Sequence, residues 1–218
     1  MNATTTAYRR LRSREAWKIP CSRHGERSYG EEHDCSISVL HCRNDTMDLK
    51  KYRRHATLRD GTTILMRPIT PEDEELMLEL FHSFSRETIY KRWFHIKEYM
   101  PREQLRKYIY NDLERDMALL AVVEDWDGEI PVGVGRFSFN EMNNSAEIAV
   151  VVRDDWQGKG VGTALVSYLT EIAKERGIEG FTAEVLADNH AMLHLFEKMG
   201  FFINKELVDG VYRLRMFF

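Results

Sequence analysis

The sequence has no apolar run close to the roughly eighteen residues that cross a bilayer, and no apolar signal core begins it. Cysteine is scarce, with three among 218 residues, and an odd, small number does not favour a disulfide framework. A chain of this length can bury a sizeable core without such staples. These absences predict a cytoplasmic protein that neither spans nor binds a membrane.

Charge is unevenly distributed along the chain. Residues 1–56 hold 12 Lys+Arg and 7 Asp+Glu, whereas residues 57–218 hold 19 and 28. The first segment also lacks apolar periodicity, so we expect a basic, disordered or loosely ordered extension over 1–56 and one folded domain over 57–218. Met47 just precedes the patterned part, which suggests it as an alternative natural start. The acidic domain argues against nucleic-acid binding and suits a lysine-bearing substrate.

A zinc site in the extension has little support. Zinc fingers pair their ligands at short, regular spacings, and that pairing is absent here. We expect no metal, although six residues have suitable side chains: Cys21, His24, His33, Cys35, His41 and Cys42.

Residues 146–177 contain the most informative pattern. Small and β-branched residues over 146–152 predict a buried strand, and helical spacing of apolar residues from Val161 predicts a helix that ends at Gly177. Glycines crowd the turn between them, QGKGVG at 157–162. Because the first N–H groups of a helix lack internal partners and carry partial positive charge, this turn predicts an anion site.

Three kinds of phosphate loop compete for this turn. The nucleoside-triphosphate loop fails because no Gly-Lys-Ser/Thr end follows at its required spacing. The dinucleotide loop opens a domain of several βαβ units, and too few residues follow the helix. The remaining pattern, Gln/Arg-x-x-Gly-x-Gly/Ala of acyl-coenzyme A loops, matches 157–162 in full.

With these flanks the chain resembles the GNAT N-acetyltransferase superfamily over residues 57–218, including DNHAMLHLFEKMGF at 188–201. Within it the chain looks closest to bacterial Pat-type protein lysine acetyltransferases, through 58–74, 87–94 and 115–122. The resemblance implies acetyl-CoA as cosubstrate. It also implies an α/β (α+β) fold, with a mixed, mostly antiparallel, V-split sheet of about seven strands flanked by about four helices.

Local patterns agree with that fold. Thr70-Pro71 marks a helix start, because a hydroxyl cap precedes proline in the first turn. Asp127-Gly128, Asn143-Asn144 and Asp209-Gly210 mark hairpin turns. We expect further helices at 101–111 and 189–199, and further strands at 62–69, 117–124, 132–139, 181–186, 202–208 and 211–217.

Glu147 is the candidate general base. It is the only ionisable residue between Ser145 and Val152, and it shares a strand face with Ala149 and Val151. A lysine amine is mostly protonated at neutral pH, so a base must take its proton. Glutamate here matches the base of Pat-type relatives, and the alternative is a glutamate in an ion pair at the rim.

The resemblance also implies the cosubstrate ligands. Backbone N–H groups of Val150, Val151 and Val152 are expected near the thioester, and Asn189 near the pantetheine arm, unless it only caps the last helix. Phe196 stands where many members have a tyrosine that protonates the leaving thiolate. Four other residues could take that role but are weak candidates: His190, His194, Tyr168 and Tyr212. The diphosphate is expected at Gln157, Gly158, Lys159, Gly160, Val161, Gly162 and Thr163.

Three functions remain open on sequence grounds. The first is acetylation of protein lysines, and the second is acetylation of a small amine such as a polyamine or amino acid. The third is a non-catalytic acyl-CoA-sensing module. The acceptor is expected beside the first helix and residues 85–100, where Tyr90, Trp93, Phe94 and Tyr99 line a groove or pack in the core. The oligomeric state is left open.

Overall fold

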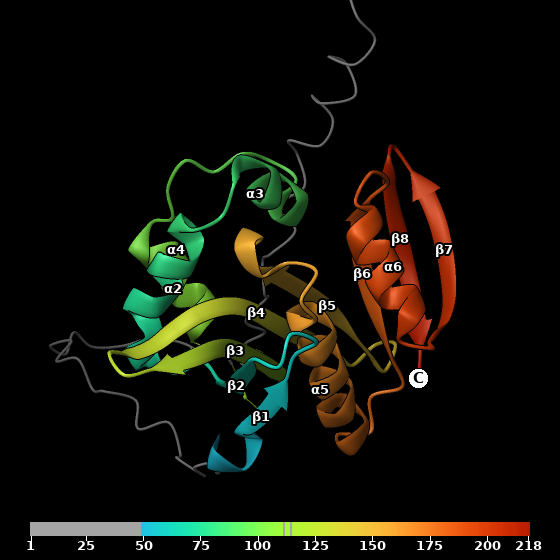
Figure 1. Cartoon of the computed structure of the whole chain (residues 1–218). Coiled ribbons are helices and arrows are strands. Elements are labelled where there is room, and N and C mark those ends of the chain that lie inside the picture. The colour runs from blue at the N-terminus through green and yellow to red at the C-terminus, as the bar shows by residue number, and fades with distance from the viewer. Residues whose placement is uncertain (1–48, 111, 114) are drawn as a thin grey trace, which may run out of the picture. The chain divides into compact units, whose positions relative to one another are not determined.

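A computed structural model describes residues 49–110, 112–113 and 115–218. They form one eight-stranded sheet in the order β1-β2-β3-β4-β5-β6-β8-β7, which is antiparallel except between β5 and β6 (Figure 1). The elements are η2 (Leu49–Tyr52), β1 (Arg54–Thr57), β2 (Thr63–Pro68), η3 (Pro71–Asp73), α2 (Glu74–His82), α3 (Arg86–Trp93), α4 (Arg102–Ile109), β3 (Asp116–Asp125), β4 (Gly128–Asn140), β5 (Ser145–Val152), η4 (Asp154–Trp156), α5 (Val161–Glu175), β6 (Gly180–Leu186), α6 (His190–Lys198), β7 (Phe202–Val208) and β8 (Val211–Phe217).

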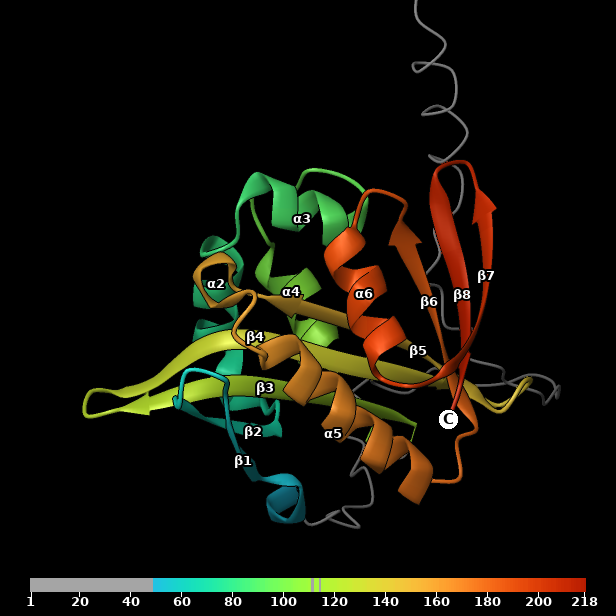
Figure 2. The ribbon, with the colours of Figure 1, turned by 45° about the vertical axis from the view of Figure 1, so that its right-hand side comes forward.

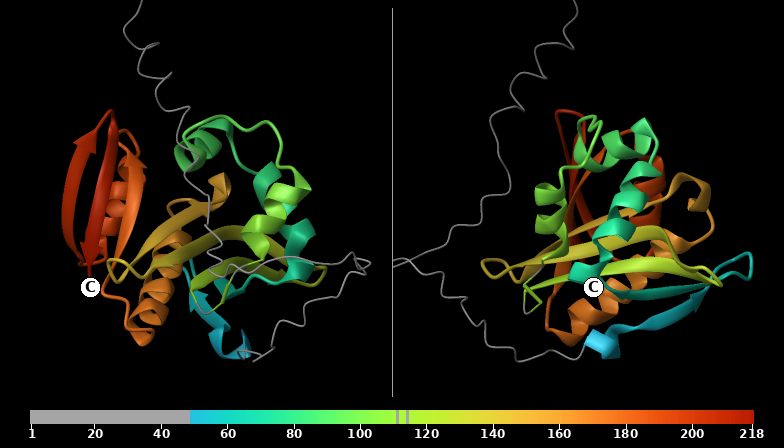
Figure 3. Two further views of the ribbon diagram at one scale, coloured as in Figure 1. Left: turned by 180° about the vertical axis from the view of Figure 1, so that it is seen from behind. Right: turned by 90° about the vertical axis from the view of Figure 1, so that its left-hand side faces the viewer.

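Helices cover both faces of this sheet. α5 and α6 lie on one face, and α2, α3 and α4 lie on the other (Figures 2 and 3). Side chains on β5 alternate between the two faces of the sheet. Ala146, Ile148 and Val150 belong to the hydrophobic core that includes the apolar face of α5, and Val151 belongs to the core that includes the apolar face of α2. Glu147 lies on the same face as Val151, toward α3, which packs on β5.

Most predicted elements are confirmed to within about two residues, and both strands of the last hairpin have their predicted bounds. The predicted mixed, mostly antiparallel fold is confirmed, and the described residues contain eight strands and five α-helices, one more of each than the approximate numbers expected. The additional elements are α3 and β1. β1 is four residues long and charged, which gives little periodicity to detect.

The expected extension over 1–56 overlaps ordered elements. Tyr52 is buried in the core on the α5 side and β1 pairs with β2, so residues from Leu49 onward contribute to the folded domain. The zinc and start-site hypotheses concern residues that lie outside the described part of the chain. No described helix has the length and apolar character needed to cross a membrane.

β5 and β6 diverge after a short junction. They pair only at Ser145–Gly180, Ala146–Phe181 and Glu147–Thr182, although both strands continue well beyond. Figures 1 and 3 show β6 and the β7–β8 hairpin turning away from β5. This is the V-shaped split that the resemblance implied, and we call the region beyond the last pair the fork.

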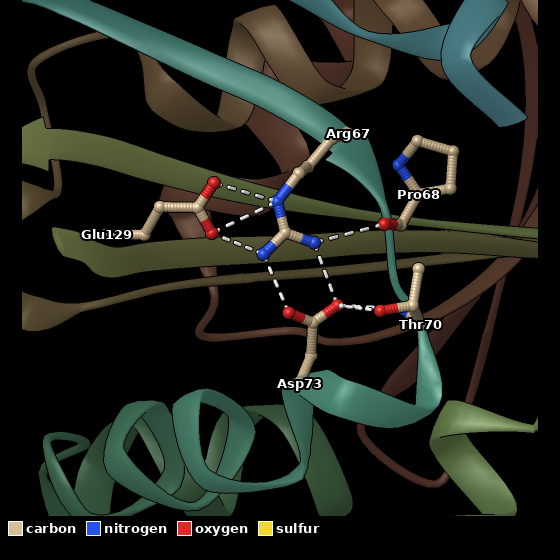
Figure 4. Close-up of polar contacts among 5 residues, drawn as sticks. All are labelled: Arg67, Pro68, Thr70, Asp73 and Glu129. Carbon is tan, nitrogen blue, oxygen red and sulfur yellow. Dashed lines mark hydrogen bonds and ion pairs between the residues drawn. The ribbon is translucent and has the colours of Figure 1, made fainter.

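A buried ion cluster attaches the start of α2 to the sheet (Figure 4). Arg67 on β2 donates to both carboxylate oxygens of Asp73, at 2.6 and 2.8 Å, and its Nε donates to Glu129 on β4 at 3.1 Å. Asp73 also accepts the Thr70 N–H at 2.7 Å, as in a capping box. Three separate segments are thereby joined through one guanidinium.

Candidate active site

Glu147 lies at the vertex of the fork. Its pair with Thr182 is the last one before the strands separate, and it is the exposed residue in a strand of buried and half-buried neighbours. The Glu147 side chain therefore remains accessible from solvent at the point where the sheet opens, although neighbouring protein covers part of it. This is where a base must lie if a substrate enters between the strands.

The surroundings raise the pKa of Glu147 above its ordinary value. Desolvation by the nearby protein is the largest cause, and the Glu184 carboxylate on β6 adds to it. The positive charges of Arg92 and Arg136 act in the opposite direction. A carboxylate whose proton affinity is increased in this way is a better proton acceptor than a free glutamate.

Backbone donors on β5 face the fork. The Arg153 N–H donates to Val132 on the β4 side at 3.0 Å. Because N–H directions alternate along a strand, the Val151 N–H also points toward β4, and those of Val150 and Val152 point toward the missing β6 partner. Two of the three predicted valine donors are thus directed into the opening.

The glycine-rich turn has the backbone that the anion-site prediction requires. Gly158 and Gly160 have φ of +75° and +112°, which side chains with a Cβ rarely adopt. The first bond into α5 is donated by the Ala164 N–H to the Gly160 carbonyl at 3.0 Å, so the N–H groups of Val161, Gly162 and Thr163 precede the helical pattern. Gly160, Val161, Gly162 and Thr163, all predicted to bind the diphosphate, therefore lie together at this helix start, with Val161 itself buried in the core.

Gly162 has a second reason to be glycine. A Cβ there would lie 2.9 Å from Leu195 Cδ1, so its absence lets α5 and α6 pack closely. Lys159 Nζ lies 4.2 Å from the centroid of the Trp156 ring, and its carbonyl accepts the Arg59 N–H at 3.3 Å. The turn therefore contacts η4 through the Lys159 side chain and the segment between β1 and β2 through the Lys159 carbonyl.

The Gln157 side chain binds within the protein. Its amide donates to the Val152 carbonyl at 3.1 Å and to the Thr88 hydroxyl on α3 at 3.2 Å. In this arrangement any ligand contact from Gln157 falls to its backbone. The side chain instead connects the glycine turn to the helix beside Glu147.

Asp154, which the sequence reading missed, reinforces that connection. Its carboxylate accepts from the Ser85 N–H at 2.8 Å, the Ser85 hydroxyl at 2.7 Å and the Thr88 hydroxyl at 2.8 Å. Ser85 is the N-cap of α3. No local signal marks Asp154 as a partner of a helix start 69 residues away.

The remaining predicted residues divide between capping and packing. Asn189 caps α6 by accepting the Met192 N–H at 3.3 Å, which is the alternative foreseen for it. Phe196 and Tyr168 are buried in the α5 core. Trp93 packs against Phe81, with its Nε1 buried and without a hydrogen-bond partner among the described residues.

The acceptor-side aromatics do not form a continuous lining. Phe94 ends α3 in a left-handed conformation, and Tyr99 is 70% exposed.

Arg92 on α3 and Arg136 on β4 were missed by sequence reasoning. Their proximity to Glu147 depends on how α3 packs on the sheet.

A family model described as "Acetyltransferase (GNAT) family" matches residues 78–201. The chain belongs to the GNAT acetyltransferase family. Acetyltransferase Pat of Mycolicibacterium smegmatis is 32% identical over 144 residues, covering 66% of this chain and 42% of that protein. L-amino acid N-acyltransferase MnaT of Escherichia coli is 34% identical over 97 residues, covering 43% of this chain and 56% of that protein. The matches thus span less than two thirds of either relative.

A solved GNAT structure agrees with the fold. The crystal structure of the GNAT domain of S. lividans PAT has a TM-score of 0.71 and 29% identity, and covers 77% of this chain and 98% of that chain. The predicted resemblance to the GNAT family, with Pat among its similar members, is confirmed. Residues 78–201 therefore belong to a GNAT acetyltransferase domain, and the GNAT family uses acetyl-CoA as acetyl donor.

Proposed function

We propose that this GNAT protein transfers the acetyl group of acetyl-CoA directly to the side-chain amine of lysines in proteins, with residues 57–218 as the domain that catalyses the transfer. The position of Glu147 at the vertex of the fork is the observation that carries this proposal. The similarity to Pat supports a protein acceptor. The similarity to MnaT supports a free amino acid as the second candidate.

The described residues fit acetyl-CoA. The N–H groups from Gly158 to Thr163 would hold its diphosphate, because they start a helix and lack helical partners. The N–H groups of Val150 and Val152 would bind the acyl-bearing arm, and Asn189 Nδ2 would add a contact from α6. Bound there, acetyl-CoA supplies an electrophilic thioester carbon and a thiol leaving group.

Glu147 would accept the amine proton. The amine nitrogen would form a bond to the acetyl carbon while the carbon–sulfur bond breaks, and coenzyme A would leave as a thiolate that takes a proton from solvent. A main-chain N–H in the fork would stabilise the negative charge that develops on the carbonyl oxygen. Phe196 cannot protonate the leaving group, but a thiol with a pKa near 8.5 needs little assistance.

The test is thiol release from acetyl-CoA with lysine-bearing proteins and, separately, with free amino acids and polyamines. We expect release with proteins and acetyl-lysine in their mass spectra. Glu147→Gln should lower turnover about a hundredfold or more at neutral pH while acetyl-CoA binding stays close to wild type. Glu206→Gln, on the exposed edge strand, is the matched control and should change neither.

Other outcomes would decide against the proposal. Release with free amines alone would favour the second candidate. Acetyl-CoA binding without release from any acceptor would indicate a sensing module. Unchanged turnover in Glu147→Gln would remove the assigned base.

A further inference from the structure

Several arginines in the described part of the chain bind carboxylates directly. Arg67 and Arg102 bind carboxylates directly, and the pKa of each is raised mainly by those hydrogen bonds. Arg92 differs. Among the described residues it forms no hydrogen bond or ion pair, and its guanidinium lies over the Trp93 ring at 5.3 Å.

Arg92 is nevertheless half-buried, in the last turn of α3. Desolvation is the main cause that lowers its pKa, so the surrounding protein does not compensate its charge. A half-buried cation without a carboxylate partner costs folding free energy, and such a group gains most from an incoming anion.

The groups around Arg92 include Glu147. Arg136, Tyr108 and Glu147 all interact with it electrostatically. Arg136 pairs with Ala149 across β4 and β5, which makes it a diagonal neighbour of Glu147 on the same face. The negative charge of Asp116 partly offsets the positive charge of Arg136. Across the fork, the Glu184 carboxylate on β6 raises the pKa of Glu147.

This arrangement constrains the acceptor. Two guanidinium groups beside the base repel an acceptor that carries a second cation near its amine, such as a polyamine. A carboxylate close to the amine would be attracted, and the planar fork of arginine binds carboxylates with two parallel hydrogen bonds.

We propose that Arg92 is a carboxylate-binding residue of the acceptor site, so that preferred acceptors carry a carboxylate within reach of the reacting amine. This inference rests on the proposed function. The carboxylate has two sources with the same chemistry: an Asp or Glu beside the target lysine of a protein, or the α-carboxylate of a free amino acid. Arg136 adds positive potential to the same subsite.

The experiment compares matched acceptors with the full chain and acetyl-CoA, by thiol release. The first series compares two lysine peptides. One carries Glu, and the other carries Gln, at the two positions before the lysine and the two positions after it. The second series compares α-amino acids with their carboxamides. We expect about a tenfold higher kcat/KM for the carboxylate form in one series, which identifies the source.

Variants connect that preference to Arg92. Arg92→Met should reduce the carboxylate-to-amide ratio to near one, and Arg92→Lys should keep part of it because the charge remains. Arg86→Met is the matched control, since Arg86 is exposed in the first turn of the same helix, and its ratio should stay at the wild-type value. Circular dichroism of each variant establishes that it is folded.

Two failures can be distinguished. Turnover with equal rates for carboxylate and amide forms in both series would overturn this inference and leave the proposed function intact. A preference that persists in folded Arg92→Met would overturn it as well. No thiol release with any acceptor would refute the proposed function, and the inference with it.

Discussion

At the scale of single residues, Glu147, the proposed base, also carries an energetic cost. Its pKa in the folded protein is raised, chiefly by desolvation. Between the unfolded and folded pKa values the native state therefore binds more protons than the unfolded chain. The free energy of unfolding falls as pH rises through that window, and the loss persists at neutral pH.

Glu147→Gln should therefore stabilise the protein at neutral pH while it reduces turnover. The glutamine cannot ionise, so it avoids the cost of a desolvated charge. We expect Tm of the variant to exceed that of wild type at pH 7 and the difference to shrink toward pH 4, measured by thermal unfolding across this range. Glu206→Gln should show no such pH-dependent gain. A gap of constant size, or a less stable variant at pH 7, would contradict the expectation.

At the scale of elements, local chemistry explains which parts were predictable. The β7–β8 hairpin has its predicted bounds because Asp209 and Gly210 both adopt positive φ, 52° and 80°, as a tight turn requires. α5 was predictable from its apolar spacing. α3 was not, because half of its eight residues are charged and the carboxylate that accepts from its N-cap belongs to Asp154 in η4, after β5.

The same distinction applies within the candidate site. Glu147 could be proposed from one strand, because it interrupts a run of small and β-branched residues. Arg92 and Asp154 could not, because their significance arises only when α3 packs beside β5. Sequence patterns report periodicity within an element, and they carry little information about contacts between distant segments.

The contacts of Asp154 predict an effect on the acceptor side. Asp154→Ala removes three hydrogen bonds from the start of α3, and Arg92 lies at the other end of that helix. We expect kcat/KM for the acceptor to fall about tenfold, with a smaller change in KM for acetyl-CoA, in steady-state assays that vary each substrate.

Asp155→Ala is the neighbouring control. Asp155 is exposed and bonds to Arg153, at 2.8 Å, rather than to α3. Its variant should behave like wild type. Equal losses in the two variants, or a loss confined to acetyl-CoA affinity, would show that Asp154 does not position α3 for the acceptor.

At the scale of the whole folded unit, the Arg67 cluster joins β2, β4 and the start of α2. Burial opposes ionisation of Asp73, but the hydrogen bonds from Arg67 and Thr70 outweigh it and lower the pKa of Asp73. The stabilisation by this carboxylate is therefore present at neutral pH and is lost as pH falls through the low folded pKa.

Asp73→Ala should destabilise the protein by about 3 kcal/mol at pH 7, because Arg67 would keep only the less buried Glu129. Urea unfolding at pH 7 and at pH 3 measures this, and the difference from wild type should narrow at the lower pH. Glu72→Ala, an exposed neighbour, should cost much less. A small or pH-independent loss for Asp73→Ala would mean that the cluster contributes little to the fold.

The separation of β5 from β6 has a consequence for how this protein can vary. A ligand rich in amide groups that enters the fork replaces an absent strand, and the groups it meets on β5 belong to the main chain. Recognition of that kind is blind to side-chain identity. Under the proposed function, Val150 and Val152 could therefore change to other β-branched residues without loss of their main-chain donors, whereas Glu147 would act through its side chain and could not be replaced in the same way.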